Sequence, residues 1–523
     1  VFRCLLSLFL KCNTCNGSNI TQIDTSVRNF PSGFLFGVSS SAYQIEGGWN
    51  QDGKSENIWD HLLHSRSYLD PEGANGDIAA DSYRFYKRDV EMVKDLEVDF
   101  YRFSLSWTRI LPSGFTDKLN LKGIAYYNNL INELLRNNIE PMVTVFHWDL
   151  PQKLQEMGGW TNPHVIDWFA DYARTVYKLF GDRVKYWITI NEPFQICSLG
   201  YGDVQLAPAL NLKGIADYMC NKYVLLAHAK AYQIYDKEFR PTQQGSIFIT
   251  LNAEWFDLDP QSTDFEAAED MRQFWWGMYA HPIFSELGDF PQMVKDRIAN
   301  KSSEQGFPRS RLLSLTAEEV EFIRGTSDFF GLNHYSTYYV YRNASVVGYY
   351  EVPSFFDDVE IILYQDRKPQ GLEWQDLKHP YLLTYITKNY NNPPVFITEN
   401  GFFTGTGLQD DERVTYLRGY LAAVLDAISE GSDIRGYSYW TLMDDYEWLK
   451  GYSMRFGLYE VDFESTERTR TARLSAFVYK HIVRTRTLDM HYEPNITLPT
   501  PRSSGPRNYP EFLISMLLLV FIV

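Results

Sequence analysis

Two glutamate residues of this sequence follow short apolar runs and could work as a pair. Glu192 comes just after the run at residues 186–190, and Glu399 comes just after the run at residues 395–398. If both runs are parallel strands of one barrel, the two carboxyl groups reach the same end of it. Two carboxyl groups that flank a glycosidic bond can cleave it, because one protonates the leaving oxygen while the other attacks the anomeric carbon or activates water. The pair therefore predicts glycoside hydrolysis.

The two runs belong to a set that recurs along the chain. Apolar, β-branched and aromatic runs of this kind are typical of strands that are buried on both faces. The eight runs lie at residues 34–38, 100–105, 142–146, 186–190, 246–251, 329–332, 395–398 and 436–440. Longer stretches between them have the apolar period of a helix, most clearly at 124–135 and 413–425.

This alternation predicts the α/β class and a single (β/α)8 TIM barrel with extended βα loops. Catalytic side chains of such a barrel lie at the carboxyl ends of the strands, which is where both glutamates are found. Residues 346–368 have the weakest pattern and are expected to form a loop over the mouth of the active site.

Composition and charge exclude several functions. Aromatic residues make up 16% of the 523 residues, which fits either a large core or a pocket lined with rings that face sugar C–H groups. The net charge of −17 argues against binding to nucleic acid and against a polybasic mode of membrane binding. The partner predicted by the glutamate pair is a small glycoside.

Both ends of the chain have features of processing signals. Residues 1–18 contain an apolar run too short to span a bilayer and are expected to be the truncated remnant of a secretory signal. Residues 493–523 end in a hydrophobic run, which is expected to be either a GPI-anchor signal or a featureless tail. We therefore expect a secreted glycoprotein, either free or anchored to a membrane through its C-terminus. Five glycosylation sequons support secretion: Asn16, Asn19, Asn300, Asn343 and Asn495.

The cysteines do not indicate a metal site. The five cysteines lack the pair-of-pairs spacing of structural zinc sites, so no metal is expected. Cys197 and Cys220 could form a disulfide or could simply be buried.

The motifs around the glutamates identify a family. Residues 25–492 resemble the catalytic domain of glycoside hydrolase family 1, the β-glucosidases and lactase-phlorizin hydrolase-like enzymes, in the style of insect members. The resemblance depends on Asn191-Glu192-Pro193, Thr398-Glu399-Asn400-Gly401 and segments 34–48, 101–107, 146–151 and 331–335.

The resemblance implies a retaining enzyme that works by double displacement. Glu192 would be the acid/base and Glu399 the nucleophile, while Arg102 and Tyr335 would support the nucleophile. A neighbouring cation favours the charged form of a carboxylate, and that charge raises the proton affinity of the other glutamate. The implied activity is that of an O-glycosyl hydrolase of β-glucosidase type, which removes terminal non-reducing β-D-glucosyl residues and accepts galactosyl or fucosyl residues with different efficiency.

The resemblance also implies a sugar-binding set. Trp440 would be the platform beneath the sugar ring, while Gln44 and Glu447 would bind adjacent hydroxyls. The whole set is Gln44, His147, Asn191, Asn333, Tyr335, Trp440, Glu447 and Trp448. Asp445 stands where the family commonly has Asn and is expected to add charge near the pocket rim.

The chemistry so implied requires no cofactor. The partner would be a small-molecule β-glycoside or a short oligosaccharide, and the oligomeric state stays open, a homodimer included. Two alternatives remain. A klotho-like binding protein on the same fold typically lacks one or both carboxylates, whereas both are present here. A myrosinase-like thioglucosidase would need a basic residue beside the sulfated leaving group, and segment 193–201 contains none.

Overall fold

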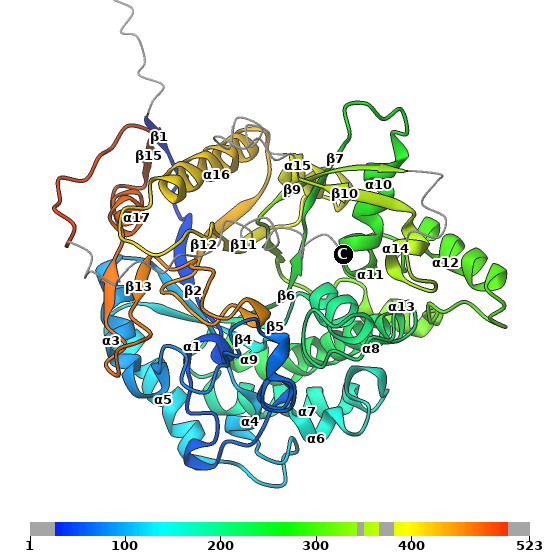
Figure 1. Ribbon diagram of the computed structural model, residues 1–523, viewed down its shortest axis with the longest axis horizontal. Coiled ribbons are helices and arrows are strands. Elements are labelled where there is room, and N and C mark those ends of the chain that lie inside the picture. The colour runs from blue at the N-terminus through cyan, green and yellow to red at the C-terminus, as the bar shows by residue number, and fades with distance from the viewer. Residues whose placement is uncertain (1–26, 343–349, 366–380, 500–523) are drawn as a thin grey trace, which may run out of the picture.

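The computed structural model describes residues 27–342, 350–365 and 381–499. Its centre is a closed barrel of eight parallel strands (Figure 1). In chain order these are β2 (Leu35–Ser39), β3 (Phe100–Ser104), β4 (Glu140–Phe146), β5 (Tyr186–Asn191), β6 (Ser246–Asn252), β8 (Phe330–Asn333), β11 (Val395–Asn400) and β12 (Ile434–Trp440). Pairing of β12 with β2 closes the barrel. The predicted (β/α)8 fold and its eight strands are therefore confirmed.

Helices surround the barrel strands (Figure 1). The two clearest helical patterns of the sequence are confirmed as α5 (Leu121–Arg136) and α16 (Asp411–Ser429). The other helices are α1 (Ala42–Ile45), α2 (Ile58–Ser65), α3 (Ser82–Asp95), α4 (Trp107–Ile110), α6 (Gln152–Gln155), α7 (Val165–Phe180), α8 (Ala216–Ile234), α9 (Arg240–Gln243), α10 (Glu266–Arg272), α11 (Met278–Phe284), α12 (Gln292–Glu304), α13 (Ala317–Ile323), α14 (Phe355–Val359), α15 (Tyr381–Asn389) and α17 (Leu474–Thr485).

The inside of the barrel changes from apolar to polar along the strands. Because strand side chains alternate between faces, residues two apart point to the same side. One interior layer is an apolar cluster formed by Phe100, Met142, Ile188, Phe248 and Phe396. Two residues further along, the strands place Arg102, Thr144, Thr250 and Thr398, which hydrogen-bond to one another in pairs. The apolar layer fills the barrel, and the polar layer supports the site above it.

Three smaller sheets accompany the barrel. A three-stranded sheet consists of β7 (Trp255–Leu258), β9 (Thr337–Arg342) and β10 (Ile361–Tyr364) and lies beside α10 (Figure 1). Two-stranded pairs join β1 (Val27–Asn29) to β15 (Thr487–Asp489) and β13 (Tyr459–Val461) to β14 (Arg470–Ala472).

The prediction of an unpatterned loop at 346–368 is wrong for the residues that the structure describes there. Segment 350–365 contains α14 and β10, and β10 pairs antiparallel with β9. The Ser354 hydroxyl caps the start of α14, and Asp358 of this helix forms a buried ion pair with Arg311. These elements have only five and four residues, which is too short for a clear apolar period.

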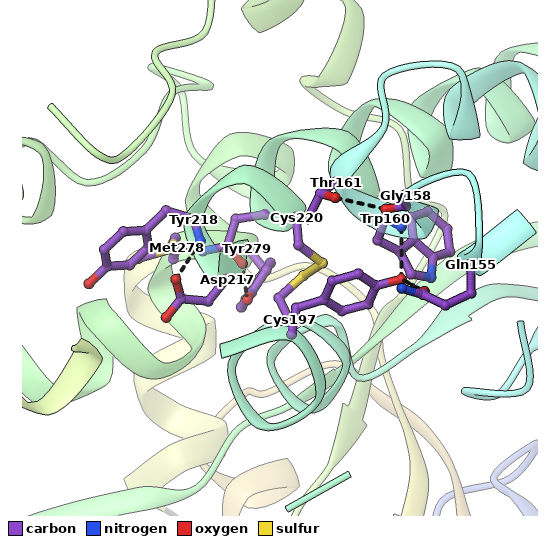
Figure 2. The surroundings of a disulfide bond; sticks show 12 residues. Gln155, Gly158, Trp160, Thr161, Cys197, Asp217, Tyr218, Cys220, Met278 and Tyr279 are labelled. Atoms are coloured by element: carbon purple, nitrogen blue, oxygen red, sulfur yellow. Dashed lines mark hydrogen bonds between the residues drawn. A yellow bond between two sulfur atoms is a disulfide. The ribbon is translucent and has the colours of Figure 1, made fainter. Parts of the chain in front are cut away.

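A disulfide joins Cys197 to Cys220, with 5.4 Å between the two Cα atoms (Figure 2). It connects α8 to the π-helical segment η4 (Gln195–Gly202), which directly follows β5 and Glu192. Of the two possibilities that the sequence left open, a disulfide or two separately buried cysteines, the structure has the disulfide.

The predicted signal remnant at 1–18 lies outside the described residues, as does most of the tail at 493–523. Within the described parts of the chain, no helix combines the length and the apolar character needed to cross a membrane.

Candidate active site

Both glutamates lie where a barrel strand departs from regular pairing. The register of β5 against β6 shifts between Ile188 and Asn191, and that of β11 against β8 shifts between Ile397 and Glu399. Such irregularities re-aim side chains at strand ends. Glu192 also has a left-handed φ of 49°, a strained conformation for a non-glycine residue. The backbone therefore turns both carboxyl groups away from the regular pleat.

Glu399 lies in surroundings that stabilise a negative charge. Its side chain is only 5% exposed, and the fully buried Arg102 guanidinium forms an ion pair with Oε1. The Tyr335 hydroxyl donates a hydrogen bond of 2.6 Å to Oε2. Each carboxylate oxygen thus has a donor of its own, and one donor is a cation.

Glu192 lies in different surroundings, which favour its protonated form. Asn333 Nδ2 donates to Oε1 at 2.7 Å, and no ion pair of Glu192 exists among the described residues. Burial raises the pKa of Glu192 well above its usual value, and the nearby charge of Glu399 raises it further. The sequence predicted the effect of that charge, whereas the larger contribution of burial needed the structure.

Asn191 connects the surroundings of the two glutamates. Its Oδ1 accepts from Arg102 Nη2 at 2.7 Å and from Asn333 Nδ2 at 3.1 Å. Arg102 and Asn333 also bind Glu399 and Glu192, so one hydrogen-bond network spans both carboxyl groups. Asn333 is in turn fixed by the Thr398 hydroxyl, which donates to its Oδ1 at 2.7 Å.

The structure brings together the polar members of the predicted sugar-binding set. Gln44 Nε2 donates to Glu447 Oε2 at 3.2 Å, so these two side chains are adjacent as the resemblance implied. Burial raises the pKa of Glu447 to about 8, and the charge of Glu399 contributes. The protonated form of Glu447 is therefore favoured, and that form can donate a hydrogen bond as well as accept one.

His147 contacts both predicted aromatic members. Its ring is nearly parallel to those of Trp440 and Trp448, with centroid distances of 5.8 and 6.0 Å. Burial lowers the pKa of His147 well below its usual value, and the Arg102 cation adds to this effect. The ring is thus neutral. Its Nε2 faces Asn191 at 3.2 Å, while the buried Nδ1 has no partner within the described part of the chain. That nitrogen can bind a sugar hydroxyl.

The prediction that Asp445 adds a charge near the pocket rim is wrong. The side chain is fully buried, and neither carboxyl oxygen has a hydrogen-bond partner among the residues described. Burial raises the pKa of Asp445 well above its usual value, and the neighbouring Glu447 and Asp444 add to the shift. These surroundings therefore favour the neutral form of the side chain. The path of the chain after β12 buries the Asp445 side chain, and a sequence motif does not reveal that path.

Two residues near the site were not assigned from the sequence. Trp148 Nε1 donates to the Asn191 carbonyl at 2.9 Å and packs against Trp448. Trp148 lies inside the 146–151 motif on which the family resemblance depends, so the sequence alone could have identified it. Glu254 follows β6 and accepts a hydrogen bond from the Ser336 amide. The sequence could have pointed to Glu254 because it is a polar residue just after a barrel strand.

No group of three or more His, Cys, Asp or Glu side chains that could hold a metal ion occurs among residues 27–342, 350–365 and 381–499. The chemical capacity of the site comes from its two glutamates, one stabilised as a carboxylate and one as an acid.

A parallel eight-stranded barrel with such a pair at its strand ends defines a (β/α)8 glycosidase. The sequence model of glycosyl hydrolase family 1 matches residues 26–488, so this chain belongs to that family. It is a β-glycosidase of the O-glycosyl hydrolase type.

Similar proteins agree with this assignment. The chain is 45% identical to Myrosinase 1 of Brevicoryne brassicae over 87% of this chain and 98% of that protein. It is 39% identical to the human cytosolic β-glucosidase over 88% of this chain and 99% of that protein. The solved structure of aphid myrosinase matches with a TM-score of 0.83 and 45% identity, over 87% of this chain and 99% of that one.

Proposed function

We propose that this chain hydrolyses terminal non-reducing β-D-glucosyl residues with retention, with Glu399 as nucleophile and Glu192 as acid/base. A carboxylate oxygen of Glu399 attacks the anomeric carbon while Glu192 gives its proton to the leaving oxygen, and the aglycone departs as an alcohol. Glu192, now a carboxylate, then takes a proton from water. The water oxygen attacks the anomeric carbon and releases Glu399.

One contrast supports this division of roles. Arg102 and Tyr335 both bind Glu399, whereas Glu192 has only the neutral Asn333 amide. The first arrangement favours an ionised nucleophile, and the second favours a protonated acid. When the glycosyl bond to Glu399 removes its charge, the pKa of Glu192 falls, because that charge is one of the causes of its elevation. The same residue can then act as a base.

The pocket favours a hexose in the glycone position. Gln44 and Glu447 are adjacent and can bind neighbouring hydroxyls, and His147 offers an unpartnered ring nitrogen. The ring of Trp440, which lies nearly parallel to that of His147, can pack against the apolar face of a sugar, and Trp448 lies on the same histidine. Glucose is the proposed preference, and galactose and fucose are accepted with different efficiency.

The decisive experiment identifies the nucleophile chemically. Glu399→Gly should lose turnover of an aryl β-glucoside, and azide should restore reaction with an α-glucosyl azide as product. Glu192→Gly is the matched control, because azide there should give the β-azide through the intact nucleophile. Substantial turnover by Glu399→Gly without azide, or a β-azide from it, would overturn the proposal.

Thioglucoside hydrolysis is the second candidate, and the 45% identity to Myrosinase 1 favours it. A sulfated aglycone would be stabilised by a basic residue near the leaving group, but η4, which follows Glu192, contains no Lys or Arg. We place O-glucosides first for this reason. A comparison of kcat/KM for an aryl O-glucoside and a glucosinolate would reverse the order if the glucosinolate were the better substrate.

We also propose that the protein is a secreted glycoprotein, anchored if the tail at 493–523 directs lipid attachment. The Cys197–Cys220 disulfide favours an oxidising compartment, and the sequon residues Asn300 and Asn495 are exposed. Full-length protein from a secretory host should lose mass on N-glycosidase treatment, and Asn300→Gln should remove part of that change. Release from cells by a phosphatidylinositol-specific phospholipase C would separate the anchored form from the free one.

A further inference from the structure

The segment between β6 and β7 holds the backbone next to Tyr335. Residues 253–255 make three hydrogen bonds to residues 333–336. Ala253 N donates to Asn333 O at 3.0 Å, and Trp255 N donates to Ser336 O at 3.4 Å. Between these two bonds, the Ser336 amide donates to the carboxylate of Glu254 at 2.9 Å. Glu254 is the only side chain among these three contacts.

Tyr335 needs such a fixed backbone because its hydroxyl must meet Glu399. Its carbonyl is held by the Tyr416 hydroxyl at 3.0 Å, and its phenol hydroxyl donates to Glu399 at 2.6 Å. Glu254 accepts from the Ser336 amide, which belongs to the same peptide group as the Tyr335 carbonyl and points the opposite way. A change at Glu254 would therefore move the donor that supports the nucleophile without a direct contact to the substrate.

Glu254 is also unusual because its ionisable side chain is buried. It is 6% exposed, and no ion pair to it exists among the residues that the structure describes. Burial raises the pKa of Glu254 to about 7, although the amides of Ser336 and Tyr335 oppose this shift. Its charge is one of the causes that raise the pKa of Glu192.

The other titratable groups around Glu254 do not change state near neutral pH. Burial raises the pKa values of Tyr338, Tyr416 and Tyr420, so these side chains stay protonated. Burial lowers the pKa of His334 to about 4, so this ring is neutral. Glu192 is therefore the group on which ionisation of Glu254 acts in the working range.

We propose that Glu254 is a positioning residue, which fixes Tyr335 against Glu399 through the Ser336 amide and adds negative charge to the surroundings of Glu192. The inference deepens the proposed function and rests on it. The Glu254 carboxylate therefore has two separate effects. Its hydrogen bond to the Ser336 amide could also be made by the amide oxygen of a glutamine, whereas its negative charge could not be supplied by a glutamine.

Two variants separate these effects. Glu254→Gln keeps an acceptor for the Ser336 amide and removes the charge, so kcat at pH 5 should stay within about threefold of wild type. The alkaline limb of kcat/KM should move to lower pH by a few tenths of a unit, because Glu192 loses a neighbouring negative charge. Glu254→Ala loses the acceptor too, and its kcat should fall about tenfold. An unchanged alkaline limb in Glu254→Gln would overturn the electrostatic part.

A Tyr335→Phe background tests the route of action. If Glu254 acts through the Tyr335 hydroxyl, Glu254→Ala should lower kcat far less in that background than in wild type, since coupled residues are not additive. Equal losses in both backgrounds would overturn the positioning role.

Asp217→Asn is the matched control for general loss of stability. Asp217 is another buried carboxylate that accepts the backbone amide of Tyr218 (Figure 2) and that of Gly214. Burial raises the pKa of Asp217 to about 7. It lies on α8 and contacts neither glutamate of the site. Asp217→Asn should lower the unfolding temperature without moving the alkaline limb; a matching shift there would count against Glu254. If Glu254 variants fail these tests while Glu399→Gly stays inactive, the inference falls and the proposed function stands.

Discussion

Glu192 and Glu399 lie at the carboxyl ends of two barrel strands and share one hydrogen-bond network through Asn191, yet only Glu399 has a cation, Arg102, against its carboxylate. Two buried carboxyl groups of the same type thereby lie in different electrostatic surroundings. Burial and the charge of Glu399 raise the pKa of Glu192, which suits an acid that must hold its proton near neutral pH.

Replacement of Glu192 should affect substrates according to their leaving groups. Glu192→Gln cannot donate a proton, so kcat/KM for an alkyl β-glucoside should fall about 10²- to 10⁴-fold. A dinitrophenyl β-glucoside departs without protonation, and its kcat/KM should fall far less. Steady-state kinetics on the two substrates give the comparison, and equal losses for both would contradict the acid role.

Removal of Arg102 should cost both activity and stability. Arg102→Met leaves Glu399 buried without its cation, and loss of one partner from a buried pair typically costs about 3–5 kcal/mol of unfolding free energy. Urea unfolding of wild type and variant measures this. Arg84→Met is the control, because its ion pair with Asp81 is exposed on the Arg84 side and should be worth less than about 1 kcal/mol. The double variant Arg102→Met/Glu399→Gln should recover part of the loss; no recovery would mean that the uncompensated charge is not the cause.

Stability should fall as the pH rises from about 6.5 to 8. Burial raises the pKa of Asp149 from 3.8 to about 8, and neither of its carboxyl oxygens has a partner in the described residues. The folded state holds this proton more tightly than the unfolded state, so the stabilisation is present at low pH and is lost as pH rises through 8. Each pKa unit of difference corresponds to about 1.4 kcal/mol.

Below pH 6.5 the buried histidines act in the opposite direction, because burial lowers the pKa of His228 to about 3 and that of His334 to about 4. Above pH 6.5 the change in stability with pH therefore comes from the buried carboxyl groups and not from these histidines. Thermal unfolding at pH 6.5 and 8.5 should show a smaller decrease for Asp149→Asn than for wild type. Identical decreases would contradict the assigned protonation of Asp149.

Loss of the disulfide should lower stability more than activity. Cys197 and Cys220 close a loop with a sequence separation of 23, for which chain entropy gives a stabilisation of about 3 kcal/mol. Cys197→Ala/Cys220→Ala should unfold at lower urea concentration and keep most of its kcat at 25 °C. Because the bond holds the segment that follows Glu192, a large loss of kcat in the folded variant would show that it also positions the acid.

The sequence alone determined the barrel and the pair of glutamates. Eight continuous apolar runs mark the strands through local composition alone, and a closed parallel barrel places every strand's carboxyl end on one face. The position of Glu192 and Glu399 after such runs was therefore enough to predict that they meet. The motifs added Arg102 and Tyr335, which the structure places against Glu399.

Tertiary structure decided the charges and the less regular segments. Asp445 was expected at the rim and lies fully buried, since exposure depends on how distant segments cover a residue. The pairing of Cys197 with Cys220, the short elements α14 and β10, and the contact of Glu254 with Ser336 also join segments with no shared local pattern. Local periodicity fixes strands and helices, whereas burial and the pKa shifts that follow from it exist only after the chain has closed around a side chain.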